Sequence, residues 1–212
     1  MRIRIAARAA FAALAVLGAA LPMAAQATVY QFNAGLNGAN EIGGGSGATA
    51  VGLATLFYDD RGTASLLDDS YDFTMAVFAL SGASGGRAAS GFHIHGAATT
   101  TENGPVRVNL DDVAFPAFNA GSTLLVGGSG ITPPTIGVTA ATGSNAGHPA
   151  MSFLDMLKGG LAYVNVHTSL NPGGAVRGQL VQVAAVVPEP ASMALMFSGL
   201  GVLGLLARRR RY

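Results

Sequence analysis

The stretch LAYVNVHTSLNPGGAVRGQL, residues 161–180, carries the clearest fold signal in this chain of 212 residues. Valines alternate with polar residues over Leu161–Thr168 and Ala175–Val183, and the sequence NPGG lies between these segments at 171–174. Proline followed by glycine fits the middle of a type II turn. The stretch therefore predicts a β-hairpin near the end of the folded region.

The alternation in this hairpin also predicts which side chains share a face. If Ser169 pairs with Ala175, the polar residues of both strands lie on one face and the apolar residues on the other. The opposed polar-face pairs are then His167 with Arg177, Asn165 with Gln179, and Tyr163 with Val181. Like charges directly opposite each other destabilise a sheet. We therefore expect His167 to be neutral, to form a hydrogen bond, and to lie near His93 and His95.

The region before the hairpin has the pattern of an all-β protein. Turn residues recur at intervals of about 8–12 residues, a spacing typical of β-sandwiches and barrels. The strands predicted from it are Val29–Leu36, Thr49–Tyr58, Tyr71–Leu80 and Phe92–His95. Tyr71–Leu80 is apolar on both faces and is predicted to be central. Met151–Lys158 has helical spacing and ends at a Gly-Gly pair, whereas 111–149 is expected to be irregular. We predict a Greek-key-like antiparallel β-sandwich or barrel with one short helix.

The first 27 residues read as a secretory signal peptide. Arginines at positions 2, 4 and 8 precede the apolar segment Ala9–Leu21, and Ala25-Gln26-Ala27 fits a small-residue cleavage site. We predict a signal helix here and cleavage after Ala27. Residues 28–183 then form one domain.

The last 29 residues predict a membrane-anchored tail. Residues 184–190 form a linker that ends in Pro188-Glu189-Pro190, and residues 191–207 lack charge and are long enough to span about 25 Å as a transmembrane helix. Residues 208–212 form an arginine-rich cytoplasmic tail under the positive-inside rule. The cluster consists of Arg208, Arg209, Arg210 and Arg211.

This order of motif, apolar helix and arginines resembles a PEP-CTERM sorting signal. The resemblance implies export in a Gram-negative bacterium, attachment to the membrane through the helix, and cleavage by an exosortase. The mature protein is then expected in the cell envelope or outside the cell.

The domain itself resembles the CHRD domain, a module that is repeated in animal chordin and occurs singly in bacterial exported proteins. The resemblance rests on His93-x-His95-Gly96, on Gly104-Pro105-Val106, and on YVNVHTSLNPGGAVRGQL at 163–180. Glutamate is usual in the family where this chain has Ala175, so we expect any ion pair made by that glutamate to be missing. The resemblance implies a fold, an exported location and a binding role.

Composition excludes several other functions. Between residues 28 and 187 there are five basic and ten acidic residues, so the excess of basic charge belongs to the two ends. A mildly acidic domain without a basic stripe argues against nucleic-acid binding. There is no cysteine, no Gly-x-Ser-x-Gly nucleophile elbow and no phosphate-binding loop. We therefore expect no enzymatic activity.

The histidines allow two interpretations. On a strand, His93 and His95 project from one face, and His167 on the hairpin can join them. In the favoured interpretation they form a structural cluster hydrogen-bonded to Asn165, Arg177 and Gln179, with no cofactor. In the alternative, the three histidines bind copper or zinc. The segment GFHIHG at 91–96 resembles the histidine strand of copper/zinc superoxide dismutases, but the other ligand segments of that family have no counterpart here.

The sequence thus predicts an exported, non-catalytic binding or structural protein of the envelope or extracellular matrix. Its expected partners are the exosortase and either exopolysaccharide or surface proteins. The rings available for stacking on a sugar are Tyr30, Tyr58, Tyr71 and Tyr163. The alternative function is a copper- or zinc-binding protein with a superoxide-dismutase-like barrel.

Overall fold

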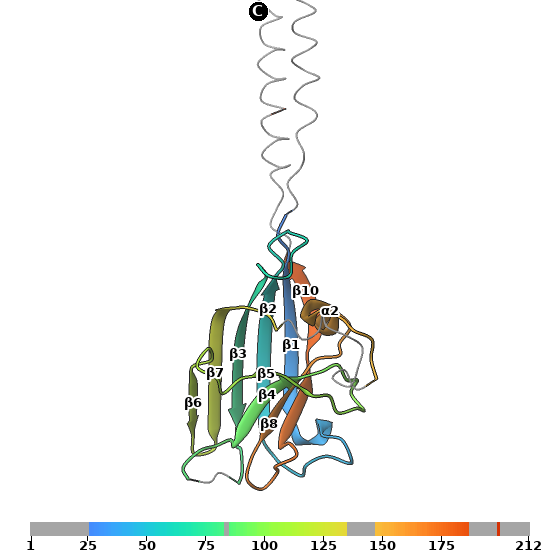
Figure 1. Cartoon of the computed structure of the whole chain (residues 1–212). Coiled ribbons are helices and arrows are strands. Elements are labelled where there is room, and N and C mark those ends of the chain that lie inside the picture. Colours follow the sequence, from blue (N-terminus) through green and yellow to red (C-terminus); the bar gives the residue numbers. More distant parts are fainter. Residues whose placement is uncertain (1–25, 83–84, 135–146, 187–198, 200–212) are drawn as a thin grey trace, which may run out of the picture.

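The computed structural model describes residues 26–82, 85–134 and 147–186, together with residue 199. Within these ranges a single antiparallel sheet curls into a half-barrel, and one short helix packs against it (Figure 1). The all-β prediction with one helix is confirmed, but a half-barrel takes the place of the expected sandwich or closed barrel. The helices predicted for 1–27 and 191–207 lie almost entirely outside the described residues. In the described part of the chain, no helix is long and apolar enough to cross a membrane.

All described strands belong to this sheet, in the order β5-β4-β8-β9-β1-β2-β3-β7-β6, and β10 also pairs with β1. Their bounds are β1 Val29–Asn37, β2 Val51–Asp59, β3 Ser70–Phe78, β4 Gly91–His95, β5 Val106–Asn109, β6 Ala117–Ala120, β7 Thr123–Ile131, β8 Tyr163–His167, β9 Val176–Gln179 and β10 Val181–Val186. The predicted strands agree with β1 to β4 and β8 to β10. Two strands fall in the irregular region, as predicted, whereas β5 was not predicted.

One hydrophobic core fills the inside of the curled sheet. Alternate residues of the strands point inward, among them Phe32, Leu56 and Phe73, each of which is fully buried. The helix α2 (Phe153–Lys158) buries Phe153 against the rings of Tyr58 and Tyr71. The helix forms where it was predicted, because the Ser152 side chain caps its first turn and Gly159 ends it.

Strand β3 is not buried on both faces as its sequence predicted. Its burial alternates along the strand, so Phe73 is inside while Phe78 is half exposed on the outer face. The apolar residues on its outer face therefore do not indicate a second buried face. The strand pairs with β2 on one side and β7 on the other.

The two ends of the half-barrel differ in what they carry. Val29 at the start of β1 pairs with Val186 at the end of β10, so the described chain enters and leaves at the same end (Figure 1). At the opposite end, Asn37 pairs with Arg177. The short 3-10 helix η1 (Gly38–Asn40) and the connection between β8 and β9 lie at that end.

The terminal hairpin forms, but its register differs by two residues from the prediction. Asn165 lies opposite Arg177 and Tyr163 opposite Gln179. A two-residue shift keeps every side chain on its predicted face, so the face assignment is correct and the pairing is wrong. The connection between the two strands is longer than a tight turn, and hydrogen bonds between Thr168 and Asn171 stabilise it.

The register also decides which residue faces Gly178, because a pairing of Ser169 with Ala175 would place Gly178 opposite Val166. Gly178 lies opposite Val164 rather than Val166, and a Cβ there would approach the Gly35 carbonyl oxygen of β1 to 2.6 Å. The glycine therefore allows β1 and β9 to approach closely, a common reason for glycine within a strand.

Candidate functional site

Strand β8 is covered on both of its faces, and its outer face is polar. Val164 and Val166 point into the core, whereas Tyr163, Asn165 and His167 point outward. Four of the five residues of this strand are nevertheless buried. Polar side chains on a buried face need partners, so this face is where the structure builds a site.

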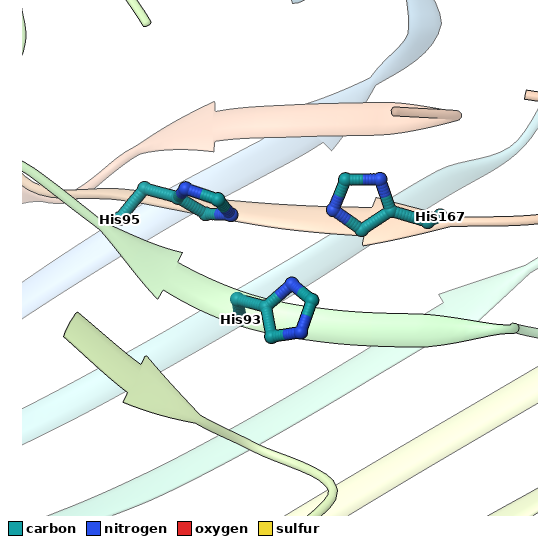
Figure 2. A group of neighbouring side chains, drawn as sticks. All are labelled: His93, His95 and His167. Carbon is teal, nitrogen blue, oxygen red and sulfur yellow. The ribbon is translucent and has the colours of Figure 1, made fainter. Parts of the chain in front are cut away.

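Three histidines meet on this outer face. His93 and His95 come from β4, and His167 comes from the end of β8, where it lies opposite Gly91. One nitrogen from each ring lies within 4.8 Å of one nitrogen of each of the other two. Figure 2 shows the three rings turned toward a common space. The sequence-based prediction that His167 lies near the His93/His95 pair is thus confirmed.

The hydrogen bonds of His95 and His167 determine which ring nitrogen carries the proton. His95 Nδ1 is 2.9 Å from the Gly104 carbonyl oxygen, and His167 Nδ1 is 2.9 Å from the Pro172 carbonyl oxygen. A carbonyl oxygen only accepts, so each Nδ1 must be the N–H donor. In the neutral ring, Nε2 then holds a free lone pair.

The nitrogens that face one another have no hydrogen-bond partner in the described structure. They are His93 Nδ1, His95 Nε2 and His167 Nε2, and all three are buried. The hydrogen bonds expected from Asn165, Arg177 and Gln179 to these rings are not among those of the described residues. The Gln179 amide donates instead to the carbonyl oxygens of Ala98 and Gly160.

Burial keeps the three imidazoles neutral. Desolvation is the largest cause that lowers the pKa of each ring, and it lowers the pKa of His95 to about 4. For His93 and His95, the neighbouring histidines lower the pKa further. The expectation that His167 is neutral agrees with these directions. The cluster therefore presents lone pairs rather than positive charge at neutral pH.

Next to the histidines lies a stack of rings that ends in a buried arginine. The His95 ring stacks on the Tyr163 ring, with the two centroids 5.0 Å apart. The Cζ atom of the Arg177 guanidinium lies 3.4 Å from the centroid of the same Tyr163 ring. Arg177 is 1% exposed. It donates to the carbonyl oxygens of Thr99 and Glu102 and to Asn103 Oδ1. Arg177 thereby holds the loop after β4 against the sheet.

Glu41 belongs to this site, although the sequence analysis did not single it out. Burial raises the pKa of Glu41 to about 7, while the charge of Arg177 and a hydrogen bond from Asn165 lower it. The carboxylate packs against Gly174, where a Cβ would come within 2.5 Å of Glu41 Oε1. Its only sequence signal is that it is the single charged residue in the glycine-rich stretch GANEIGGGSG.

Comparison with known protein families agrees with this architecture. A model of the CHRD domain matches residues 32–180, which is most of the chain. The chain belongs to the CHRD domain family. A model of the PEP-CTERM protein-sorting motif matches residues 186–211. Neither the curated proteins nor the solved structures gave a match.

The sorting motif marks this CHRD domain protein as one that is exported in a Gram-negative bacterium and processed by an exosortase. The residues predicted to form the signal, Pro188-Glu189-Pro190 and the arginines 208–211, fall within the matched range but outside the described residues.

The CHRD domain retains a carboxylate near Arg177 despite Ala175. Ala175 is buried, and its carbonyl oxygen accepts a hydrogen bond from Ser46 Oγ. The Glu41 carboxyl group, from the loop after β1, lies near enough to Arg177 to influence the pKa of the arginine.

The surface near this site has two hollows, and Glu41 and Ile42 line both of them. One has a volume of about 430 Å³ and is also lined by Asn40, Thr101 and Gln179. The other, of about 470 Å³, is lined in addition by Ser46, Asn103 and Asn171. Their surfaces offer amides, hydroxyls and a carboxylate at the end of the half-barrel opposite Val29 and Val186.

The predicted stacking rings do not line these hollows. Tyr58, Tyr71 and Tyr163 are each at most 2% exposed. Tyr30 is partly buried on β1, near the other end of the sheet. The fourth histidine, His148, lies apart from the cluster and bonds to Glu102 at 3.0 Å.

Proposed function

We propose that this protein is a non-catalytic polysaccharide-binding protein of the cell envelope or extracellular matrix. The observation that carries the proposal is the placement of the two polar hollows at the end of the half-barrel opposite Val186. Val186, the first residue matched by the sorting motif, pairs with Val29 at one end of β1, whereas Glu41 follows the other end.

This placement suits a protein that is held at a membrane before processing. A nine-residue strand rises about 30 Å. That distance separates the attachment end from the hollows. A chain anchored through residues beyond 186 would therefore present the hollows to the surroundings rather than to the membrane.

The lining favours a hydroxyl-rich polymer over a protein surface. Protein interfaces are enriched in aromatic residues at their centres, and no aromatic residue lines either hollow. Amide, hydroxyl and carboxylate groups can hydrogen-bond to sugar hydroxyls. Binding would thus rest on hydrogen bonds and not on ring stacking.

A non-catalytic role is supported by the histidine site. Nucleophilic catalysis needs a nucleophile within hydrogen-bond reach of a base. Among the described residues, no hydroxyl, thiol or carboxylate bonds to a ring nitrogen of His93, His95 or His167.

The test is co-sedimentation of the full-length chain, purified in detergent, with extracellular polysaccharide from the producing cells. Thr101→Ala in the hollow should weaken binding, whereas the matched control Thr74→Ala, exposed on the outer face of β3, should not. Equal binding by both variants, or binding only to surface proteins from the same cells, would contradict the proposal.

A further inference from the structure

We propose that His93, His95 and His167 form a binding site for a divalent first-row transition-metal ion, Zn²⁺ or Cu²⁺, on the outer face of β4 and β8. This proposal is independent of polysaccharide binding, which concerns the two hollows lined by Glu41 and Ile42. It rests on three features of the histidine cluster: its converging nitrogens, the fixed tautomers of His95 and His167, and the room that Gly91 leaves for the imidazole rings.

The first feature is the convergence of three buried nitrogens that lack partners. A buried polar atom without a hydrogen bond is unfavourable, and three such atoms face one another here. Two of them, the Nε2 atoms of His95 and His167, hold lone pairs and cannot donate to each other. An ion that accepts lone pairs resolves this arrangement.

The second feature is the support behind the ligands. Histidines that bind metals usually donate the other ring N–H to a carbonyl or a carboxylate, which fixes the tautomer and the ring orientation. His95 and His167 both do so, to Gly104 and Pro172. The carbonyl acceptors come from two different loops, so the orientation of each ring is set independently of the cluster.

The third feature is the glycine opposite His167. Gly91 pairs with His167 across β4 and β8. A Cβ at residue 91 would lie 3.2 Å from His93 Cε1 and 4.0 Å from His167 Cδ2. The absence of a side chain here leaves room for the three imidazoles on one face.

The chemistry of the ligands selects the class of ion. Imidazole nitrogen suits zinc and copper, whereas calcium and magnesium prefer oxygen. Zinc–nitrogen bonds of about 2.0–2.1 Å bring ligand nitrogens to within about 3.5 Å of one another. The rings therefore need to close only slightly from the 4.8 Å limit of the structure. Three protein ligands leave one tetrahedral position open for water or an external ligand.

The experiment is a titration of the full-length chain, freed of metal with a chelator and purified in detergent, with Zn²⁺ and separately with Cu²⁺. Calorimetry should show one ion bound per chain. Removing a group that only hydrogen-bonds to a metal ligand already costs about 10–100-fold in affinity, so His93→Gln and His167→Gln should each weaken binding at least about tenfold. The matched control is His148→Gln, which removes the histidine that pairs with Glu102 outside the cluster and should leave affinity unchanged.

A second measurement does not depend on how well the variants fold. In the wild-type chain labelled with ¹⁵N, Zn²⁺ should shift the Nδ1 signal of His93 and the Nε2 signals of His95 and His167. Circular dichroism establishes that each variant is folded before its affinity is compared. The proposal is overturned if folded wild-type chain binds no stoichiometric ion, if folded cluster variants bind as well as wild type, or if Zn²⁺ shifts only His148.

Discussion

Strands β3 and β8 belong to the same sheet but have different surroundings on their outer faces. On β3, burial alternates, and Asp72, Thr74 and Phe78 face the solvent. On β8, the loops after β1, β4 and β8 cover the outer face, so Tyr163 and Asn165 are as buried as the valines between them. A strand covered on one face needs only an apolar inner side. A strand covered on both must also give each polar side chain on its second face a partner.

That requirement explains why the candidate sites lie on the β8 side of the sheet. Arg177, Tyr163 and Asn165 find partners in the covering loops, and the loop carbonyls orient His95 and His167. The polar atoms left over, among them the facing histidine nitrogens, are the places where a ligand can bind. Among the described residues, nothing covers the outer face of β3 in this way, so its polar side chains can remain in contact with solvent.

The largest expected effect tests the inner and outer faces of β3. Phe73 is fully buried, and Phe73→Ala should lower the free energy of unfolding by about 3–5 kcal/mol through a lost side chain and a cavity. Phe78→Ala, on the same strand but half exposed, should change it by less than about 0.5 kcal/mol. Urea denaturation measures both. A comparable cost for Phe78→Ala would mean that the outer face of β3 is covered after all.

A second prediction tests the buried polar side chains on the outer face of β8 and β9. Arg177→Met keeps much of the apolar stem but removes three hydrogen bonds and leaves Glu41 without its nearby cation. Removing one partner from a buried charged network is strongly destabilising, and we expect a loss of about 3 kcal/mol.

The matched control for Arg177 is Arg61→Met. The Arg61 side chain is 49% exposed and pairs with Asp59 at 3.2 Å. An exposed ion pair contributes no more than about 1 kcal/mol. If urea denaturation gives equal losses for the two arginines, the loops do not depend on Arg177 for their position.

A third prediction tests whether a buried polar pair beside β3 is as important for stability as the buried polar groups beside β8. Tyr58 donates a 2.6 Å hydrogen bond to the buried Asp69. Tyr58→Phe should cost about 1–2 kcal/mol, because Asp69 then loses its partner. Tyr30→Phe removes a longer bond of 3.4 Å to Asp60 from a partly buried ring and should cost less than about 0.5 kcal/mol. Thermal unfolding of the two variants compares them, and a neutral Tyr58→Phe would show that Asp69 is satisfied in another way.

The last comparison concerns the dependence of stability on pH. Burial raises the pKa of Glu41 from 4.5 to about 7. The folded protein therefore keeps a proton that the unfolded chain releases, so the contribution of Glu41 to stability falls as pH rises from 4.5 to about 7 and is constant above that. Glu41→Gln should remove this decline, so its stability relative to wild type should rise between about pH 5 and about pH 8.

Glu102 provides a contrast of opposite sign. The Thr99 N–H and then His148 lower the pKa of Glu102 to about 2. The contribution of Glu102 to stability is present above pH 4.5 and is lost as pH falls toward 2. Glu102→Gln should therefore lower the free energy of unfolding most near neutral pH. Urea denaturation at a series of pH values should show that the free energy of unfolding, relative to wild type, changes in opposite directions with pH for the two variants. Parallel pH profiles would mean that Glu41 has an ordinary pKa in the folded protein.

Much of this arrangement could be predicted from the sequence because it depends on local patterns. Alternation placed His93, His95 and His167 on one face of their strands, and a serine and two glycines bounded α2. Alternation has a period of two, however, and a two-residue shift leaves it unchanged. The hairpin register was therefore predicted on the correct faces but with the wrong partners.

By itself, the sequence determined the segments of β1 to β4 and β8 to β10, the short helix, the faces of the hairpin residues, the CHRD family and the sorting motif. These follow from periodicity, turn residues and motifs that lie close together in the chain. Only the tertiary structure decided that the sheet curls into a half-barrel, that Glu41 approaches Arg177 from a distant loop, and that β3 is exposed where β8 is covered. It also decided that the backbone carbonyl groups of Gly104 and Pro172 fix the tautomers of His95 and His167. Every residue carries such a carbonyl group. Backbone groups have no sequence signature, so their contribution to a site appears only when the chain is folded.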